Sequence, residues 1–538
     1  MDLAAVAVRL PRLRDAGNRL QADAHQLQAD VTDGGTAGIA RADALLGRLQ
    51  ADSRALGSAA GGAAWTTTAV IPGLSGPLDA AQALAADART LTDGVLPDYL
   101  ALLHSVRSLS LQGGATDLAP LLAARGPAAS AAAKVDALRT TIDRRPISGV
   151  PQIARAQRAL AKAVGQLHGY AKSIDVALAV APDLLGADGP RTTLAVLESP
   201  AESRGTGGLV GGYVLLRAQN GRITVVSQGT QSQMGGVTDA TGLPADFVHT
   251  YEPLGVLRDW RATPLSPDFP VTAQVWRKLW AAAHPGQVDG FLAITPAAVA
   301  AVLSVTGPVT LPDGTTVTAE SVQRFLQLDV YAKFPLQQQE PVRDAYQHLV
   351  LAAMLDKVSA YRGSPMPLLR ALGGAVSGGL RLAASDPAQE AKLATTPLGG
   401  SLRYDPGRPV LGIDNTDGSK LDQFLDRLVT YRATGGRVSA TVTLTNTAPT
   451  TGLPAYVTYR VDLGTDAARA QHRPGEHMVL AALYLPGTVT DVSVTVDGHA
   501  EAPRSVLPEN GRTVVFVVPR ALGPGGDATT FTVTGTAR

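Results

Sequence analysis

The chain has 538 residues, with 47 Lys and Arg against 46 Asp and Glu and a formal net charge of +1. This balance does not indicate a nucleic-acid-binding protein, which usually shows a basic face or a basic run. The absence of cysteine excludes disulfides, cysteine-bound zinc and thiol catalysis, and it fits either an extracytoplasmic protein or a chain that avoids thiols. The length is sufficient for about three domains.

The first third of the chain is alanine-rich and has a helical pattern. Apolar residues follow three-four spacing over 20–31 and again over 39–56, with a glycine break at 33–35, which predicts an antiparallel helical hairpin. Further amphipathic helices are predicted over 81–95, 129–142 and 151–178. Small residues at the helix seams allow close packing, so residues 1–182 are expected to form a helical bundle or stalk without chemistry of its own.

The N-terminal region carries no convincing membrane signal. Three arginines directly follow the first short apolar run, and no small-residue cleavage site follows, which argues against a signal peptide. The longest uncharged window, 55–78, contains glycines together with Pro72 and Pro77, which make a poor transmembrane helix. This window is expected to be a buried helix-to-helix connection around Trp65.

The rest of the chain predicts two further domains. Strand and helix signals alternate over 183–435, with helices expected through 274–280, from Pro296 and over 340–358, and a helix followed by a loop at 321–334. This alternation predicts an α/β sandwich with helices on a mixed sheet. Short runs of period two from 436 to 538 predict a β-sandwich, including a strand over 456–463. The fold class is therefore multidomain, with helical, α/β and β parts.

The glycine-rich stretch 202–226 comes close to the dinucleotide-binding fingerprint, which requires a helix directly after its glycines. Two strand-like runs joined by a hairpin signal at Asn220-Gly221 follow instead, so no helix N-terminus is available to hold a pyrophosphate. The glycines are therefore expected to be structural and to allow positive φ or close backbone packing. The glycines concerned are Gly207, Gly208, Gly211 and Gly212.

Five motifs, in this order and spacing, resemble the bacterial envelope family known as "domain of unknown function 4012". They are AESRGTGGLVGGYVLLRAQNGRITV, SPDFP, VDGFLAITPAAVAAVLSVTGPVTLPDGTTVTAESV, LDVYAKF and VLGIDNTDGSKLDQFLDRLVTY. The preceding helical region, with Trp65 and the IPG stretch 71–73, and the trailing β domain resemble the same family. The resemblance implies an extracytoplasmic, membrane-associated protein of the cell envelope and cell wall. The N-terminal membrane anchor expected for the family is not found in this chain.

The core order is also similar, more distantly, to the LytR-CpsA-Psr phosphotransferases, which move glycopolymers from a polyprenyl pyrophosphate lipid to peptidoglycan. By this resemblance Lys333 and Arg343 fill two basic positions and Gln347 matches a glutamine. Tyr346 stands where a second arginine would be, and Ser227-Gln228-Gly229 replaces another. The resemblance therefore supports the fold more than the activity.

A pyrophosphate site needs guanidinium or ammonium groups, and usually Mg²⁺ held by one or two carboxylates. A loop arginine is otherwise often a solvated or locally paired charge. Arg204 stands out because it lies at a strand end beside glycines, and it is expected to meet Arg343 at one anion, with Asp329 as the carboxylate partner. The phosphate-binding candidates are Arg204, Arg258, Arg261, Lys333, Arg343 and Gln347, and the metal-binding candidates are Glu198, Asp268 and Asp329.

Other catalytic constellations are absent from the sequence. No G-x-S-x-G elbow and no P-loop lysine occurs, and the nine histidines are scattered. The closest histidine pair, His472 and His477, is expected to lie on the surface of a polar loop.

Two hypotheses for function remain. The first is a non-catalytic envelope scaffold with a degenerate LytR-CpsA-Psr-like core, in which the stalk and the β-sandwich contact other envelope proteins. The alternative is a domain that binds or transfers an envelope glycopolymer, a phosphoglycan or a polyprenyl-linked carrier. A fold alone does not decide between them, and the two missing arginines favour the scaffold slightly.

Overall fold

The computed structural model describes residues 36–61, 75–107, 111–112, 115–230, 233–335, 337–363 and 365–538, with short pieces between 15 and 27. The chain folds into two compact units, and each is described by itself. One comprises residues 1–111, 116–182 and 364–366, and the other comprises 112–115, 183–363 and 367–538. Trp65, the stretch 71–73 and the break at 33–35 lie outside the described residues.

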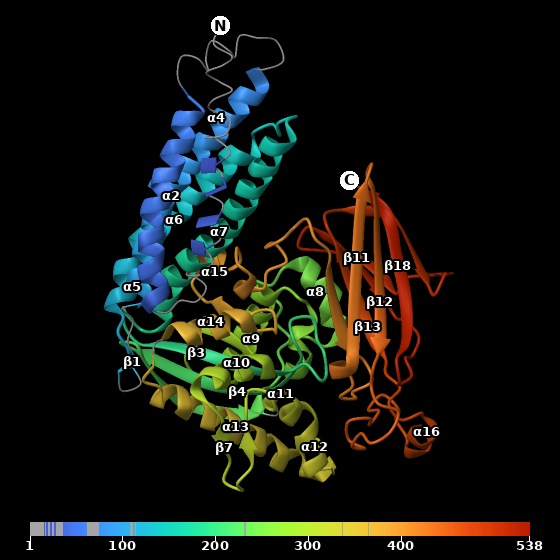
Figure 1. The fold of residues 1–538 in the computed structure, drawn as a ribbon. Coiled ribbons are helices and arrows are strands. Elements are labelled where there is room, and N and C mark those ends of the chain that lie inside the picture. Colours follow the sequence, from blue (N-terminus) through green and yellow to red (C-terminus); the bar gives the residue numbers. More distant parts are fainter. Residues whose placement is uncertain are drawn as a thin grey trace. The chain divides into compact units, whose positions relative to one another are not determined.

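The smaller unit is helical (Figure 1). Its elements are α2 (Thr36–Ala59), α4 (Ser75–Arg89), the π-turn η1 (Thr90–Val95), α5 (Leu96–Arg107), α6 (Ala119–Asp143) and α7 (Pro151–Leu184). Alanines and leucines at three-four spacing face one another in the interhelical cores, as Val135, Leu138 and Val164 do between α6 and α7. The helices predicted over 39–56, 81–95, 129–142 and 151–178 are confirmed. Among the described helices, none combines the length and apolarity of a membrane span.

The larger unit contains a mixed sheet in the order β5-β4-β3-β6-β9. These strands are β5 (Arg222–Thr230), β4 (Leu209–Gln219), β3 (Arg191–Ser199), β6 (Gly290–Ile294) and β9 (Arg381–Ala384), and only β3 and β6 run parallel among neighbours in this set. The short β1 (Leu111–Gln112) and β2 (Ala115–Thr116) extend the β5 edge, where Ala115 pairs with Arg222. Asn220 and Gly221 both have positive φ, as a two-residue hairpin requires, so the predicted hairpin is confirmed.

Helices cover both faces of this sheet (Figure 1). Leu194 and Val196 of β3 face a core with α8 (Ala245–Tyr251) and α9 (Phe269–Ala283), whereas Ala195 faces a second core with α10 (Pro296–Thr306) and α13 (Glu340–Ala360). The predicted α/β sandwich with a mixed sheet is therefore confirmed. The shorter elements are η3 (Glu252–Leu254), η4 (Trp260–Leu265), β7 (Val309–Thr310), β8 (Thr316–Val317), η6 (Gln337–Gln339), α14 (Pro365–Ala375), α15 (Pro387–Leu393) and η7 (Pro397–Gly399).

The segment 321–334 differs from the sequence prediction. Helical turns continue through α11 (Val322–Arg324), the π-turn η5 (Phe325–Asp329) and α12 (Val330–Lys333), so the predicted loop is wrong. Val322, Phe325 and Val330 are all buried in the core with α13. Because this packing stabilises the helical turns, they continue until just before Pro335.

The C-terminal part is an antiparallel β-sandwich, as predicted. One sheet has the order β10-β13-β17-β16 and the other the order β11-β12-β18-β14-β15. The first consists of β10 (Val410–Asn415), β13 (Val479–Leu485), β17 (Arg512–Val517) and β16 (Ser505–Glu509). The second consists of β11 (Leu425–Thr434), β12 (Arg437–Asn446), β18 (Asp527–Ala537), β14 (Val489–Val496) and β15 (His499–Glu501), with η8 (Asp422–Phe424) before β11 and α16 (Asp466–Gln471) in a connecting loop.

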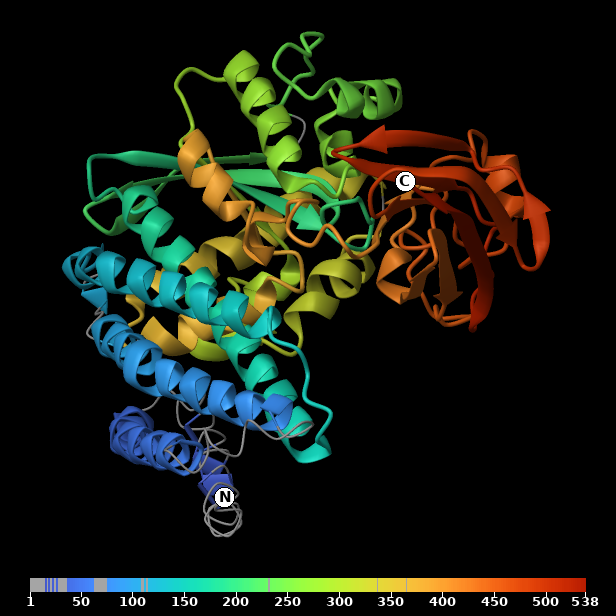
Figure 2. The same ribbon diagram turned by 90° about the horizontal axis from the view of Figure 1, so that it is seen from above.

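The β13 sheet is buried on both faces. Ala481 and Leu483 of β13 pack into the sandwich core, whereas Ala482 and Tyr484 pack into the core formed with α8 and α9. The sandwich and the α/β layers therefore share one sheet and form a single compact unit, and the views in Figures 1 and 2 show them side by side. The strand predicted over 456–463 is wrong, because this segment forms turns that place Tyr456 on Tyr331.

The glycine-rich loop between β3 and β4 is packed too tightly for side chains at several positions. None of the four glycines predicted to be structural has positive φ. A Cβ at Gly208 would lie 2.1 Å from the Ser199 carbonyl oxygen, and one at Gly212 would lie 2.7 Å from the Gly229 carbonyl oxygen. A Cβ at Gly207 would meet the Glu198 carboxylate at 2.2 Å. Gly211 is different, because it is the extra residue of a β-bulge and a Cβ there would have no neighbour closer than 4.0 Å.

We expect Gly208→Ala to lower the free energy of unfolding by about 1–3 kcal/mol, because the added methyl must displace backbone. Gly211→Ala, three residues further on in β4, is the matched control and should change stability little. Chemical denaturation of both variants measures the difference, and equal stability of the two would contradict the close approach at Gly208.

Candidate functional site

Charged residues of the sequence motifs come together where the loop 200–208 lies against the end of β10 and the segment 416–424. The Asn415 amide donates to the Ser203 carbonyl at 3.0 Å, and the Asp422 amide donates to the Ala201 carbonyl at 3.3 Å. We call the charged side chains gathered there, most of them buried, the loop network; they are Glu202, Arg204, Asp414, Asp417, Lys420, Asp422, Arg427, Arg460 and His477.

Arg204 is held inside this network by backbone carbonyls. Its Nη1 donates to the carbonyl oxygens of Ser203 at 2.8 Å and Asn415 at 3.1 Å. Its Nε is buried and makes no hydrogen bond with any described residue. Burial lowers the pKa of Arg204, and the nearby carboxylates of Asp414 and Asp422 oppose that shift. The guanidinium therefore joins two chain segments, as a structural cation does.

Asp414 supplies a negative charge near Arg204. Burial raises the pKa of this carboxyl group to about 7, although Arg204 acts in the opposite direction. The Gly205 backbone amide also lowers this pKa, although neither carboxyl oxygen makes a hydrogen bond of ordinary geometry with a described residue. Burial therefore favours the protonated form of Asp414.

A buried ion group lies at the centre of the loop network. His477 Nδ1 is 3.0 Å from Asp417 Oδ2, and His477 Nε2 is 3.2 Å from Asp422 Oδ1, with all three side chains fully buried. Burial alone would lower the pKa of His477, but the two carboxylates raise it to about 10, so the imidazole is charged at neutral pH. Asp422 Oδ2 also accepts hydrogen bonds from the Ser203 amide at 3.0 Å and from Asn415 Nδ2 at 2.6 Å.

The sequence-based expectation for the histidines is wrong. His477 is not on the surface but is buried in the ion group. The His472 side chain is also little exposed, and its Nδ1 lies 2.8 Å from a Glu476 carboxyl oxygen. The carboxylates of the ion group come from the IDNTDGSKLD stretch, where Asp417 and Asp422 flank a lysine. The short spacing of these two aspartates in the sequence could have indicated a shared site. His477 comes from a distant segment, and nothing in the sequence around it indicates that it joins them.

Arg343 lies on a pair of stacked tyrosines. The rings of Tyr331 and Tyr456 are 5.3 Å apart and nearly parallel, and the Arg343 guanidinium carbon is 3.9 Å from the Tyr456 ring centre. The guanidinium donates from Nη1 to the Phe334 carbonyl at 3.0 Å, and the residue is 2% exposed. Arg343 is therefore a buried cation that stabilises the packing of α13 on the α12 turn.

Lys420 approaches the same tyrosines. Its Nζ is 5.8 Å from the Tyr331 ring centre and 5.5 Å from the Tyr456 ring centre, and it pairs with Glu202. Burial lowers the pKa of Lys420 to about 7, against the nearby Asp422. Through Lys420, the tyrosine pair and the loop network are continuous, although Arg204 and Arg343 share no direct partner among the described residues.

The other predicted phosphate ligands are engaged elsewhere. Three are partly exposed cations, each paired with a carboxylate, and Gln347 donates to the Leu326 carbonyl at 3.0 Å. The ion pairs are Arg258–Glu252 at 3.0 Å, Arg261–Asp259 at 2.9 Å and Lys333–Asp313 at 2.7 Å.

The three predicted metal ligands have separate environments. Glu198 is buried and accepts a hydrogen bond from Thr206 Oγ1. Asp268 accepts hydrogen bonds from the Leu402 amide and from Asn510 Nδ2. Asp329 forms an ion pair with Arg324 at 3.0 Å. Burial raises the pKa of Glu198 to about 8, against Thr206 and Arg381, so this carboxyl is largely protonated at neutral pH and poorly suited to Mg²⁺. Among the described residues, no three acidic or histidine side chains are grouped as metal ligands.

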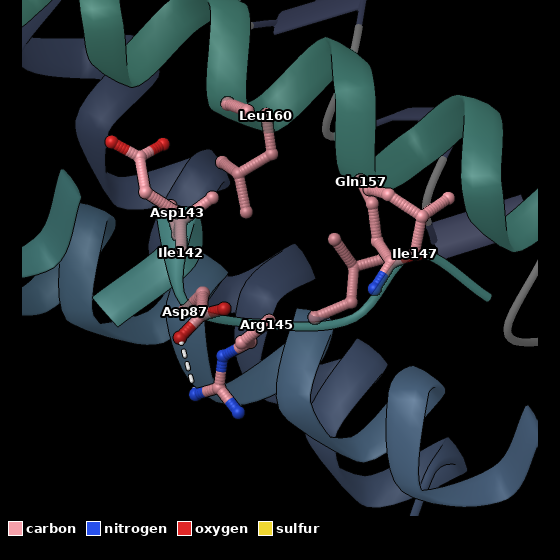
Figure 3. Close-up of a pocket in the computed structure, with 9 residues that line it drawn as sticks. Asp87, Ile142, Asp143, Arg145, Ile147, Gln157 and Leu160 are labelled. Carbon is pink, nitrogen blue, oxygen red and sulfur yellow. Dashed lines mark hydrogen bonds and ion pairs between the residues drawn. The ribbon is translucent and has the colours of Figure 1, made fainter. Parts of the chain in front are cut away.

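A cavity of about 200 Å³ lies in the helical unit, between α4, α6, α7 and the connection 144–150 (Figure 3). Asp87 and Arg145 form an ion pair of 2.8 Å in its wall, and Ile142, Ile147 and Leu160 supply apolar surface. None of the predicted phosphate or metal ligands lines it.

Comparison with known proteins finds a family model that matches part of the chain. Residues 188–331 match the family model described as a protein of unknown function, DUF4012. No curated protein matches the chain. A solved fragment of a Listeria monocytogenes protein, described as a proposed transcriptional factor, is 12% identical with a TM-score of 0.21, over 39% of this chain and 79% of that one.

We expect His477→Gln to lower the free energy of unfolding by about 3–5 kcal/mol near neutral pH, because it leaves two buried carboxylates without a counter-charge. The stabilisation by the imidazolium is fully present below the unfolded histidine pKa of about 6.5 and is lost as pH rises through about 10. Denaturation of wild type and variant should therefore show a difference that shrinks toward alkaline pH. The exposed His499→Gln is the control, and a pH-independent difference would contradict a charged His477.

Glu198→Gln tests the protonation state of the buried Glu198 carboxyl group. The folded-state pKa is about 8, above the unfolded value of about 4.3, so the associated stabilisation is present at acidic pH and is lost as pH rises through about 8. Glutamine resembles the protonated acid and does not titrate. Thermal unfolding across this range should show the variant gaining stability relative to wild type as pH rises, with the exposed Glu501→Gln unchanged. A constant difference would mean that Glu198 is ionised throughout.

Proposed function

We propose that this chain is a non-catalytic scaffold or interaction protein of the bacterial cell envelope, whose core has an enzyme-like fold without phosphate chemistry. One observation carries the proposal: the cations expected to bind a pyrophosphate already have internal partners. Arg258, Arg261 and Lys333 each face their own carboxylate.

The buried cations support the same conclusion. A phosphate site presents several donors toward one place where the anion can sit. Arg204 instead directs Nη1 to two backbone carbonyls, and Arg343 lies on Tyr456 with its Nη1 on another carbonyl. A pyrophosphate would have to displace these contacts before either guanidinium could bind it.

The envelope assignment rests on the family. The five motifs resemble domain of unknown function 4012, and residues 188–331 match its model. A cysteine-free chain suits an extracytoplasmic location. The LytR-CpsA-Psr resemblance remains part of the proposal as a relationship of fold.

The alternative function is binding or transfer of a phosphoglycan or polyprenyl pyrophosphate with Mg²⁺. Its specific support is Arg204 Nε, a buried polar atom without a hydrogen-bond partner in the described structure. Such an atom is where a ligand would attach after the loop 200–208 moves.

A triple variant separates the two functions without disturbing the core. We expect Arg258→Ala/Arg261→Ala/Lys333→Ala to fold normally, because exposed ion pairs contribute at most about 1 kcal/mol each. A scaffold carrying these changes should complement a deletion strain as well as wild type does. Titration with a soluble polyprenyl pyrophosphate analogue and Mg²⁺ should show no saturable binding to either protein.

The matched control is neutralisation of three exposed cations outside the α/β core, Arg437→Ala/Arg504→Ala/Arg538→Ala. Failure of the first triple variant to complement while the control succeeds, or saturable binding that the first triple variant weakens at least tenfold, would favour the transfer function instead.

A further inference from the structure

Strand β11 leaves a long backbone edge without a partner in the described structure. It is ten residues long and stands at the end of its sheet, with β12 on its other side. All ten residues pair with β12 in unbroken register, from Leu425 with Asn446 to Thr434 with Arg437. On the edge of β11 that faces away from β12, the backbone groups of residues 425–434 make no hydrogen bond with the backbone of another described residue.

This edge lacks most of the features by which proteins usually prevent strand addition. Natural edge strands are short, bulged, covered, interrupted by proline or protected by charged side chains, especially lysine. Among the other edges described here, β15 has three residues, β9 has four, and β16 contains Pro508. The end of β10 is covered by the loop 200–208 through the Asn415–Ser203 hydrogen bond. Of these features β11 has only charged side chains, namely Asp426, Arg427 and Arg432, and Leu428 on it is 62% exposed.

The side chains of β11 alternate between two faces. Leu425, Val429 and Tyr431 pack toward the sandwich core, so the even-numbered residues face solvent. Those residues are Asp426, Leu428, Thr430, Arg432 and Thr434, with a negative charge near one end and a positive charge near the other.

We infer that β11 pairs antiparallel with β11 of a second copy of this chain, about a two-fold axis at Val429. This register places Asp426 opposite Arg432 of the other copy, and symmetry forms the pair twice on the solvent face. Leu428 then lies opposite Thr430 of the other copy. The charge pattern of the strand is thus complementary to itself in this orientation, which is why the occupant is a second copy and not an unrelated strand.

Each dimer would join two five-stranded sheets into one continuous sheet across both copies. Main-chain hydrogen bonds along the edge supply most of the affinity, and the two ion pairs set the register. The dimer depends only on the sandwich surface, so it goes beyond the proposed scaffold function and holds whether or not the α/β core acts on phosphates.

Charge exchange tests the register in the full-length chain. Sedimentation velocity over a wide concentration range should show a monomer–dimer equilibrium for wild type. Asp426→Arg and Arg432→Asp should each raise the dimer dissociation constant at least tenfold, because each places like charges opposite one another twice. The double variant Asp426→Arg/Arg432→Asp should restore wild-type association.

Glu501→Arg on β15, at the opposite edge of the same sheet, is the control and should leave the equilibrium unchanged. Circular dichroism and thermal unfolding confirm that each variant is folded. A monomer at every concentration, or a dimer that the single variants do not weaken, would overturn the inference.

Cysteine cross-linking gives a second readout, because the chain has no cysteine of its own. Residues directly opposite in an antiparallel pair have Cα atoms about 4.5–5.5 Å apart, within the range that a disulfide spans. An oxidised mixture of Leu428→Cys and Thr430→Cys chains should form more disulfide dimer than either variant alone. Equal cross-linking in the mixture and in the separate variants would contradict the register centred on Val429.

Discussion

The buried contact of His477 with Asp417 and Asp422 is the constraint on which the larger unit depends. Removing three charges from water costs several kcal/mol for each ion, and close pairing has to offset that cost. Asp422 Oδ1 lies 3.2 Å from His477 Nε2, and Asp422 Oδ2 accepts hydrogen bonds from the Ser203 amide and from Asn415 Nδ2. These contacts join the β3–β4 loop to the sandwich, so the loop cannot leave its position without exposing or unpairing a charge.

This constraint explains why the loop between β3 and β4 is rich in glycine. With Ser203 held against Asp422 and Asn415, the neighbouring backbone is pressed onto other chain segments. A Cβ at Gly205 would lie 2.1 Å from the Leu265 carbonyl oxygen, and one at Gly208 would be as close to Ser199. A glycine-rich pattern that resembles a phosphate-binding loop is explained here by the close approach of backbone to backbone.

Local patterns predicted much of the fold, and tertiary contacts explain most of what they missed. Period and turn signals are properties of neighbouring residues, and they identified α9, α13, the hairpin at Asn220 and most sandwich strands. The site was harder, because Arg204 was singled out for a phosphate whereas its partners, Asp414 and Asn415, come from a strand about 210 positions away. His477 gave no signal, since nothing near it in sequence indicates two distant carboxylates.

The doubly buried β13 sheet limits where this unit can act. Its strands use one face for the sandwich core and the other for the α/β core, so neither face is left for a partner. The opposite sheet differs, because its strands β12 and β18 place threonines on their outer face. Two of these threonines, Thr441 and Thr532, hydrogen-bond to each other through their hydroxyl groups. A hydroxyl-covered face is well hydrated and gives little driving force for docking. The outer edge of β11, which pairs with β12 on its other side, therefore offers backbone groups for the self-association that we infer, whereas the described sheet faces offer little apolar area.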